Sequence, residues 1–184
     1  MIKSKEELKA FIKEDNSWYI LHNNKSGLID RFISFPAVKI RRYLKYLRKQ
    51  EYFINTANGN KLKGLIGLYC ERKKNKIGIK LGIEIHPNCF DSGLSIFHTG
   101  SIVVNHASRI GKNCKLHGAN CIGNNGKDCG VPKIGDNVDI GYGAVVIGDI
   151  TIADSITIGA NAVVNRSFLE PGITIAGVPA KRIK

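Results

Sequence analysis

Aliphatic residues recur at every sixth position in the C-terminal half of the chain. Between Val104 and Val164, ten of the eleven positions of this series are Val, Ile or Leu, and only Asp128 breaks it. The stretch holds seventeen such residues among sixty-one, so random placement would fill only about three of the eleven positions. A period of six fits neither a helix nor one long strand, but it is typical of short strands joined by regular corners. The pattern predicts the hexapeptide form of a parallel β-helix. The aliphatic members are Val104, Ile110, Leu116, Ile122, Ile134, Ile140, Val146, Ile152, Ile158 and Val164.

The positions around each aliphatic residue fit the corners and the narrow interior of such a coil. Glycine follows the aliphatic residue in five repeats, as expected for tight corners, whose backbone must tolerate a positive φ. Four residues after the aliphatic position, small side chains fill the interior in several repeats. These two sets are Gly111, Gly123, Gly135, Gly141 and Gly159, and Ser108, Cys114, Ala144 and Ala162.

One segment, residues 124–133, interrupts the repeat, and Ile134 resumes it in phase. We therefore expect a loop that leaves the coil at this point. Loops extruded from a solenoid commonly carry its function, and the alternative is a purely structural insertion at a corner.

The N-terminal segment has helical signals instead. Ser4, followed three residues later by Glu7, forms a capping box for a first helix. Pro36 suits the first turn of a second helix, because its φ is fixed near the helical value. We expect a third helix over residues 62–70, with the polar run 71–76 as the connector into the coil. The first helix has the apolar stripe Leu8, Phe11 and Ile12, and the second has Ile40, Tyr43, Leu44 and Leu47 opposite Arg41, Arg42, Lys45, Arg48 and Lys49.

Charge divides the chain in the same way. Residues 1–80 hold 19 Lys and Arg against 7 Asp and Glu, a net charge of +12, whereas residues 81–184 hold 9 against 8, a net charge of +1. We expect a basic α-helical segment over 1–76 and a mainly β coil over 77–184. The basic segment either is simply solvated or attracts an acidic substrate or an anionic membrane surface, and the sequence leaves these alternatives open. Because it carries no known nucleic-acid-binding motif, we do not expect it to bind nucleic acid.

The hydrophobic runs and the cysteine pattern of the sequence bear on where the protein is located and on whether it holds disulfides or a metal. The N-terminus is charged and no run of eighteen apolar residues exists, so we expect neither a secretory signal nor a membrane span, and a cytoplasmic location. The five cysteines are odd in number and lack C-x-x-C spacing, which argues against a disulfide framework. No cluster has the character of a metal site, so no catalytic metal is expected.

Four motifs occur in a fixed order along the predicted coil. They are IEIHP at 83–87, GLSIFHTGSIVVN at 93–105, the loop GNNGKDCGVPKIG at 123–135 and AGVPAKRI at 176–183. Over roughly residues 77–184 this order resembles the serine acetyltransferases and the related saccharide O-acetyltransferases of the hexapeptide-repeat acyltransferase family. The resemblance implies a left-handed parallel β-helix that forms a homotrimer or a multiple of it, with acetyl-CoA bound in the groove between coils.

Acetyl transfer to a hydroxyl requires a base that takes the hydroxyl proton, because an alcohol is a poor nucleophile at neutral pH. His98 stands in the segment HTGSIVV, which resembles the catalytic histidine segment of the family, and is the expected general base. The resemblance implies that Glu84 hydrogen-bonds this imidazole and selects its tautomer. His117 is a third catalytic candidate, with an exposed corner imidazole as the alternative.

The resemblance also implies where the cofactor lies. The pantetheine arm is expected along the coil corners near Tyr142, Gly143 and Ala160. Lys181, in the segment GVPAKRI, is the expected partner of a CoA phosphate, because a lysine ammonium serves as a point charge. Asn165 is a weaker candidate for the same ligand.

Departures from the serine enzymes point to a different acceptor. The family loop has Arg-His-Pro where this chain has Gly130, Val131 and Pro132, and the acidic residue before the catalytic histidine is Phe97 here. A desolvated amino acid needs partners for both of its charges. We therefore expect a saccharide or a polysaccharide precursor as acceptor, in contact with the loop residues Asn124, Asn125 and Lys127. The alternatives are serine O-acetylation in cysteine biosynthesis and a scaffold protein without catalytic activity.

Overall fold

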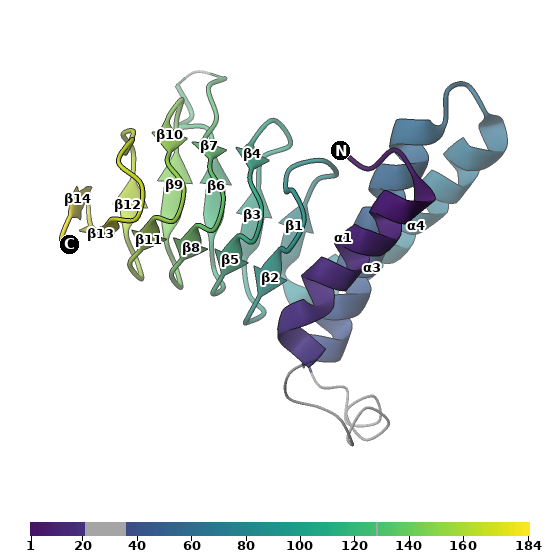
Figure 1. Ribbon diagram of the computed structural model, residues 1–184, viewed down its shortest axis with the longest axis horizontal. Coiled ribbons are helices and arrows are strands. Elements are labelled where there is room, and N and C mark those ends of the chain that lie inside the picture. The colour runs from purple at the N-terminus through teal and green to yellow at the C-terminus, as the bar shows by residue number, and fades with distance from the viewer. Residues whose placement is uncertain (21–35, 128) are drawn as a thin grey trace.

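The computed structural model consists of a bundle of helices packed on one end of an elongated coil of short strands (Figure 1). It describes residues 1–20, 36–127 and 129–184. Asp128, the position that breaks the six-residue series, lies outside the described residues. Within the described part of the chain, no helix is long and apolar enough to cross a membrane.

The described helices are α1 (Lys5–Ile20), α3 (Pro36–Thr56) and α4 (Lys61–Leu81). The predicted capping box is confirmed, because the Glu7 amide donates to Ser4 Oγ at 3.0 Å and the Ser4 amide donates to Glu7 Oε2 at 3.1 Å. The predicted connector at 71–76 is wrong. These residues continue α4, since all of them tolerate a helix and the first left-handed stop is Gly82, with φ of 67°.

Short strands form three sheets that run along the coil. Sheet A has the order β1-β3-β6-β9-β12, sheet B has β10-β7-β4, and sheet C has β14-β13-β11-β8-β5-β2. All pairs are parallel except β13 with β14. The strands are β1 (Ile83–Ile85), β2 (Ser95–Ile96), β3 (Ile102–Val104), β4 (Arg109–Ile110), β5 (Lys115–Leu116), β6 (Cys121–Gly123), β7 (Lys133–Ile134), β8 (Asp139–Ile140), β9 (Val145–Ile147), β10 (Thr151–Ile152), β11 (Thr157–Ile158), β12 (Val163–Val164), β13 (Thr174–Gly177) and β14 (Ala180–Arg182). The predicted left-handed parallel β-helix is confirmed.

The six-residue period sets which residues fill the coil. Every aliphatic member of the series is buried, from Val104 on sheet A through Ile110 on sheet B to Leu116 on sheet C and onward. Three repeats make one turn, so each residue stacks on a residue from the next turn, about 4.8 Å away along the coil. The described residues between β6 and β7, 124–127 and 129–132, lie outside the strands of the coil, as predicted (Figure 1).

The helices cover the open end of the coil, where the first strands would otherwise expose unpaired backbone groups. Tyr43 of α3 accepts from the Ile85 amide at 3.0 Å, and Lys74 of α4 donates to the Ile85 carbonyl at 2.9 Å. Tyr19 of α1 accepts from the Ile96 amide at 3.1 Å and donates to the Ile96 carbonyl at 2.7 Å. Sheets A and C thus end on hydroxyl groups supplied by helices.

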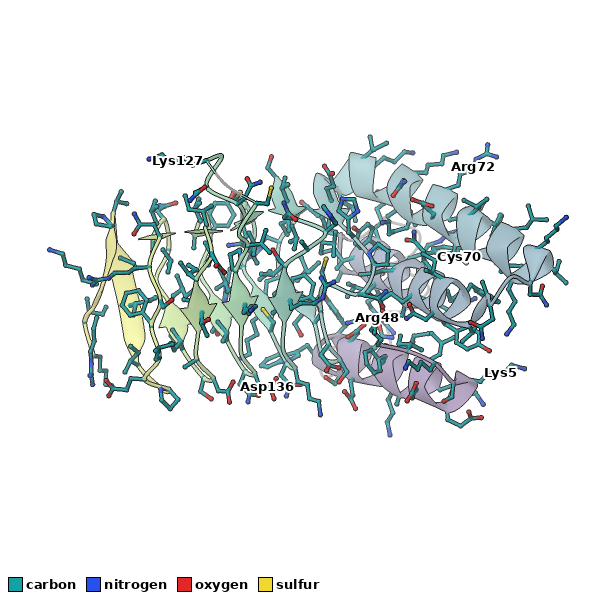
Figure 2. The ribbon with its side chains drawn as sticks, turned by 90° about the horizontal axis from the view of Figure 1, so that it is seen from above. Lys5, Arg48, Cys70, Arg72, Lys127 and Asp136 are labelled. Atoms are coloured by element: carbon teal, nitrogen blue, oxygen red, sulfur yellow. The ribbon has the colours of Figure 1, made fainter. Side chains whose placement is uncertain are left out.

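The third side of this end is closed by Arg48, which lies among α1, α3 and the coil (Figure 2). Its guanidinium donates to the carbonyls of Phe90 and Asp91 and pairs with Asp15 and Glu51. The prediction that Arg48 belongs to the solvated face of its helix is wrong. The side chain is fully buried, because two carboxylates and two carbonyls together replace the water that it loses.

Candidate active site

The predicted base lies at the corner where the chain passes from β2 in sheet C to β3 in sheet A. The register of sheet C pairs Ile96 with Leu116, Leu116 with Ile140, and Ile140 with Ile158. Two residues after each of these, one residue per coil stacks at the same corner. This set, called here the His98 column, is His98, Gly118, Tyr142 and Ala160.

The contacts around Gly118 confirm how closely the column packs. A Cβ atom on Gly118 would lie 3.2 Å from Cβ of His98 and 3.1 Å from Cε2 of Tyr142. Glycine is required there for a second reason, because its φ is 118°. The structure therefore brings the predicted base and the predicted cofactor residues Tyr142 and Ala160 to one corner, with Gly143 beside them at 2.9 Å from its amide to the Gly118 carbonyl.

A buried asparagine holds this corner in place. Asn120 is inside the coil, where its Oδ1 accepts from the Gly118 amide at 3.0 Å and its Nδ2 donates to the Gly141 carbonyl at 2.8 Å. It thus links two successive coils beneath the His98 column. His98 itself is exposed, as a group that must meet a substrate needs to be.

Next to the column, a row of side chains projects outward from sheet C. The rings of Phe97 and His117 stack with centroids 4.7 Å apart and 20° between their planes. His117 Nε2 lies 2.7 Å from Asp139 Oδ1, and Lys115 Nζ lies 3.6 Å from Asp139 Oδ2. From α1, the Trp18 ring meets Phe97 edge-on at 5.8 Å.

Sequence motifs single out neither Lys115 nor Trp18 of this row, nor Asp139, which makes the shortest contact in it. Its partner His117 lies on the preceding coil, and the extruded loop at 124–132 separates the two residues in sequence. Counting repeats without the loop would have placed Asp139 one coil above Lys115, its register partner.

Glu84 does not pair with His98 in this structure. It projects outward from β1 on sheet A, beside Val103 of the next coil, and its Oε1 lies 3.8 Å from Nε2 of His86. The described side chains show no hydrogen bond between Glu84 and His98, so the predicted dyad stays a prediction.

The remaining predicted residues lie elsewhere on the coil. Asn124, Asn125 and Lys127 follow β6 at the corner between sheets A and B, and Asn165 follows β12 at the same corner. Within the loop, Asn125 Oδ1 accepts from the Lys127 amide at 2.8 Å. Lys181 is exposed on β14 at the far end of sheet C, paired with Ala176. One chain therefore does not bring the loop to the His98 column.

Curated relatives match the coil. A serine acetyltransferase of Staphylococcus xylosus is 41% identical over 106 residues, which are 56% of this chain and 49% of the relative. One of Helicobacter pylori is 40% identical over 105 residues, which are 55% of this chain and 61% of the relative. The chain thus covers only about half to three fifths of these two relatives. No family model matches it.

Solved structures match nearly the whole chain, helices included. Soybean serine acetyltransferase without ligands has a TM-score of 0.71 at 22% identity, covering 97% of this chain and 69% of that one. The Neisseria gonorrhoeae enzyme in complex with serine has a TM-score of 0.70 at 25% identity, and the match covers 98% of this chain and 71% of that one. A serine acetyltransferase in complex with CoA has a TM-score of 0.71 at 23% identity, and the match covers 97% of this chain and 71% of that one. The resemblance to hexapeptide-repeat acyltransferases of the serine acetyltransferase type is confirmed.

The expected saccharide acceptor is wrong, and a role in polysaccharide synthesis is not supported. The matching relatives, at 40–41% identity, are serine acetyltransferases, and so are the structural neighbours. The expectation rested on charged residues missing at Gly130, Val131 and Phe97. Such absences are a weak guide in a coil, because other turns bring charged groups to the same place. Here His117 stacks on Phe97 and is hydrogen-bonded to Asp139.

Proposed function

We propose that this chain, similar in sequence and fold to serine acetyltransferases, transfers the acetyl group of acetyl-CoA to the hydroxyl of serine. The observation that carries the proposal is the His98 column. It brings the histidine of the HTGSIVV segment to the same corner as Tyr142 and Ala160, the residues expected along the cofactor. The similarity to the relatives supports serine as the acceptor.

In the proposed reaction, His98 accepts the proton of the serine hydroxyl while the hydroxyl oxygen attacks the thioester carbon. A carbon–oxygen bond forms, the carbon–sulfur bond breaks, and the imidazolium returns the proton to the departing sulfur. The corner supports this role, because Asn120 and Gly118 fix the backbone beside His98 while the imidazole stays exposed. Glu84 is proposed to orient the imidazole once the acceptor is bound.

Acetyl-CoA is proposed to lie along the His98 column, so that its thioester reaches His98 and its phosphates extend toward the C-terminal end of the coil. Lys181 at that end is the proposed phosphate partner. Asn165 lies at the corner between sheets A and B, away from the His98 column, and is therefore a weaker candidate for binding CoA.

We propose that three copies of the chain associate. A single chain holds His98 at the corner between sheets C and A, and the loop residues Asn124, Asn125 and Lys127 at the corner between sheets A and B. Figure 2 shows Lys127 and Asp136 at opposite edges of the coil. A neighbouring copy is the proposed source of the loop that reaches each His98.

The proposal is tested by release of free CoA from acetyl-CoA with and without L-serine, with formation of O-acetylserine followed by mass spectrometry. The expected result is release that depends on serine and saturates with it, at least a hundredfold above the rate of the His98→Asn variant. Absence of serine-dependent release would overturn the proposal. Tight binding of acetyl-CoA without turnover would favour the scaffold alternative.

A further inference from the structure

Beside the His98 column, five side chains from three coils and α1 form one cluster, called here the Asp139 cluster. It consists of three flat rings, one carboxylate and one ammonium group, each of which contacts two others. Its members are Trp18, Phe97, Lys115, His117 and Asp139.

The hydrogen bond between His117 and Asp139 determines what the imidazole presents. An ionised carboxylate can only accept, so Nε2 of His117 is the donor across the 2.7 Å contact. In the neutral ring Nδ1 is then an acceptor. Phe97 covers one face of the ring and so holds its orientation. The side chains of His117 and Asp139 remain 38% and 30% exposed, which leaves them within reach of a small ligand.

The chain already places an ammonium group in this cluster. Nζ of Lys115 lies 3.6 Å from Asp139 Oδ2 and 4.8 Å from the centroid of the Trp18 ring. A carboxylate and an aromatic face are the groups that recognise a primary ammonium. In the neutral ring of His117, Nδ1 is a further hydrogen-bond acceptor for an ammonium group.

We infer that the Asp139 cluster is the subsite for the α-ammonium group of the amino acid acceptor. This inference rests on the proposed function and names the part of the site that recognises the acceptor. Phe97 directly precedes His98, and His117 lies one coil above Phe97. From the rise along a strand and the spacing between strands, the Cα atoms of His98 and His117 are about 6 Å apart. The hydroxyl and ammonium of serine, on adjacent carbons, fit between these two histidines.

The chain contains a single tryptophan, and it is a member of the cluster. Trp18 fluorescence therefore reports directly on the subsite, with no need for turnover. The ligands are L-serine and 3-hydroxypropanoate, which keeps the hydroxyl and the carboxylate but lacks the ammonium. We expect the Trp18 fluorescence to change saturably as serine is added, and 3-hydroxypropanoate to bind at least tenfold more weakly than serine.

Two variants and a control assign the effect to the cluster. Asp139→Asn should weaken serine binding about tenfold and leave 3-hydroxypropanoate binding unchanged. Lys115→Met should strengthen serine binding a few-fold, because it removes the ammonium that competes for Asp139. Asp149→Asn, a matched change at the exposed corner before β10, should have no effect.

Equal binding of the two ligands, an unchanged serine affinity in Asp139→Asn, or unchanged or weaker serine binding in Lys115→Met would overturn the inference. The CoA-release assay judges the proposed function separately. Serine-dependent CoA release with no effect of Asp139→Asn would refute the subsite alone. Serine binding that depends on Asp139, without CoA release, would refute the reaction alone.

Discussion

Arg48 of α3 and Asp15 of α1 form a buried ion pair, with 2.7 Å between Nε and Oδ2. Burial opposes the charge on Arg48, but Glu51 and Asp15 outweigh it and raise the pKa of the guanidinium. Oδ1 of Asp15 also accepts from the amides of Gly93 and Leu94 in the first coil. One pair thus joins two helices and the coil.

Replacing Asp15 with Asn should destabilise the chain by about 3 kcal/mol, because it leaves the buried charge of Arg48 only partly compensated. Unfolding in urea, followed by circular dichroism, measures the change. The control is Glu14→Gln on the exposed side of α1, which should alter stability by less than about 0.5 kcal/mol. A loss below about 1 kcal/mol in Asp15→Asn would contradict this role.

Stability should fall steeply in alkali. Burial raises the pKa of Tyr19 from 10.0 to about 12. Because the folded state keeps the phenol neutral, the stability contributed by the shifted pKa is complete below pH 10 and is lost as the pH rises toward 12, amounting to about 3 kcal/mol. Denaturation at a series of pH values should show that the free energy of unfolding falls less over this range in Tyr19→Phe than in the unmodified chain. The exposed Tyr69→Phe change should leave the profile as it was.

His98→Asn should lower kcat by a factor of about 10² to 10⁴, because no other group takes the hydroxyl proton. Binding of acetyl-CoA should stay within twofold, as measured by calorimetry. Glu84→Gln should have a smaller effect, since it leaves the imidazole in place. The matched change His106→Asn, at an exposed position on another corner, should keep full activity. Turnover by His98→Asn within a few-fold of the unmodified chain would reject the assignment.

Gly118→Ala should reduce kcat about tenfold, because a Cβ at this position presses on His98 and Tyr142 and the φ of 118° is strained for alanine. Steady-state kinetics with acetyl-CoA and serine measures the effect. Gly172→Ala is the control: its φ of 76° is also strained, but a Cβ there meets nothing within 4 Å. Equal kinetics for the two variants would show that contact with His98 is unimportant.

Light scattering of the purified chain should give the mass of a trimer or a multiple of it. The physical reason is that the loop and the His98 column lie at different corners of one coil, so a second chain is needed to unite them. Deletion of residues 124–131 should lower activity more than it changes the measured mass. A monomer at micromolar concentration with full activity would contradict the proposed assembly.

The sequence by itself determined the coil. Burial inside a narrow coil requires an aliphatic residue at each sixth position, and this requirement is local, so it can be read without knowing any partner. The same holds for the start of α3 at Pro36 and for the capping box of Ser4 and Glu7, since each depends on neighbours within one helical turn. His98 was predicted from the segment HTGSIVV and Tyr142 from the family resemblance, and the register of the coil places both residues at one corner.

Only the tertiary structure decided which charged residues are buried and which distant ones meet. Arg48 has the spacing of a solvated face, yet Asp15, Glu51 and two carbonyls from the coil surround it. The six-residue period, counted without the loop, gives the coil and register of Asp139, but not the hydrogen bond between its side chain and His117. In both cases the stabilising interactions come from partners far away in the sequence, whose side chains meet only once the helices and coils have stacked. A local pattern of hydrophobic and polar residues does not encode these contacts between side chains.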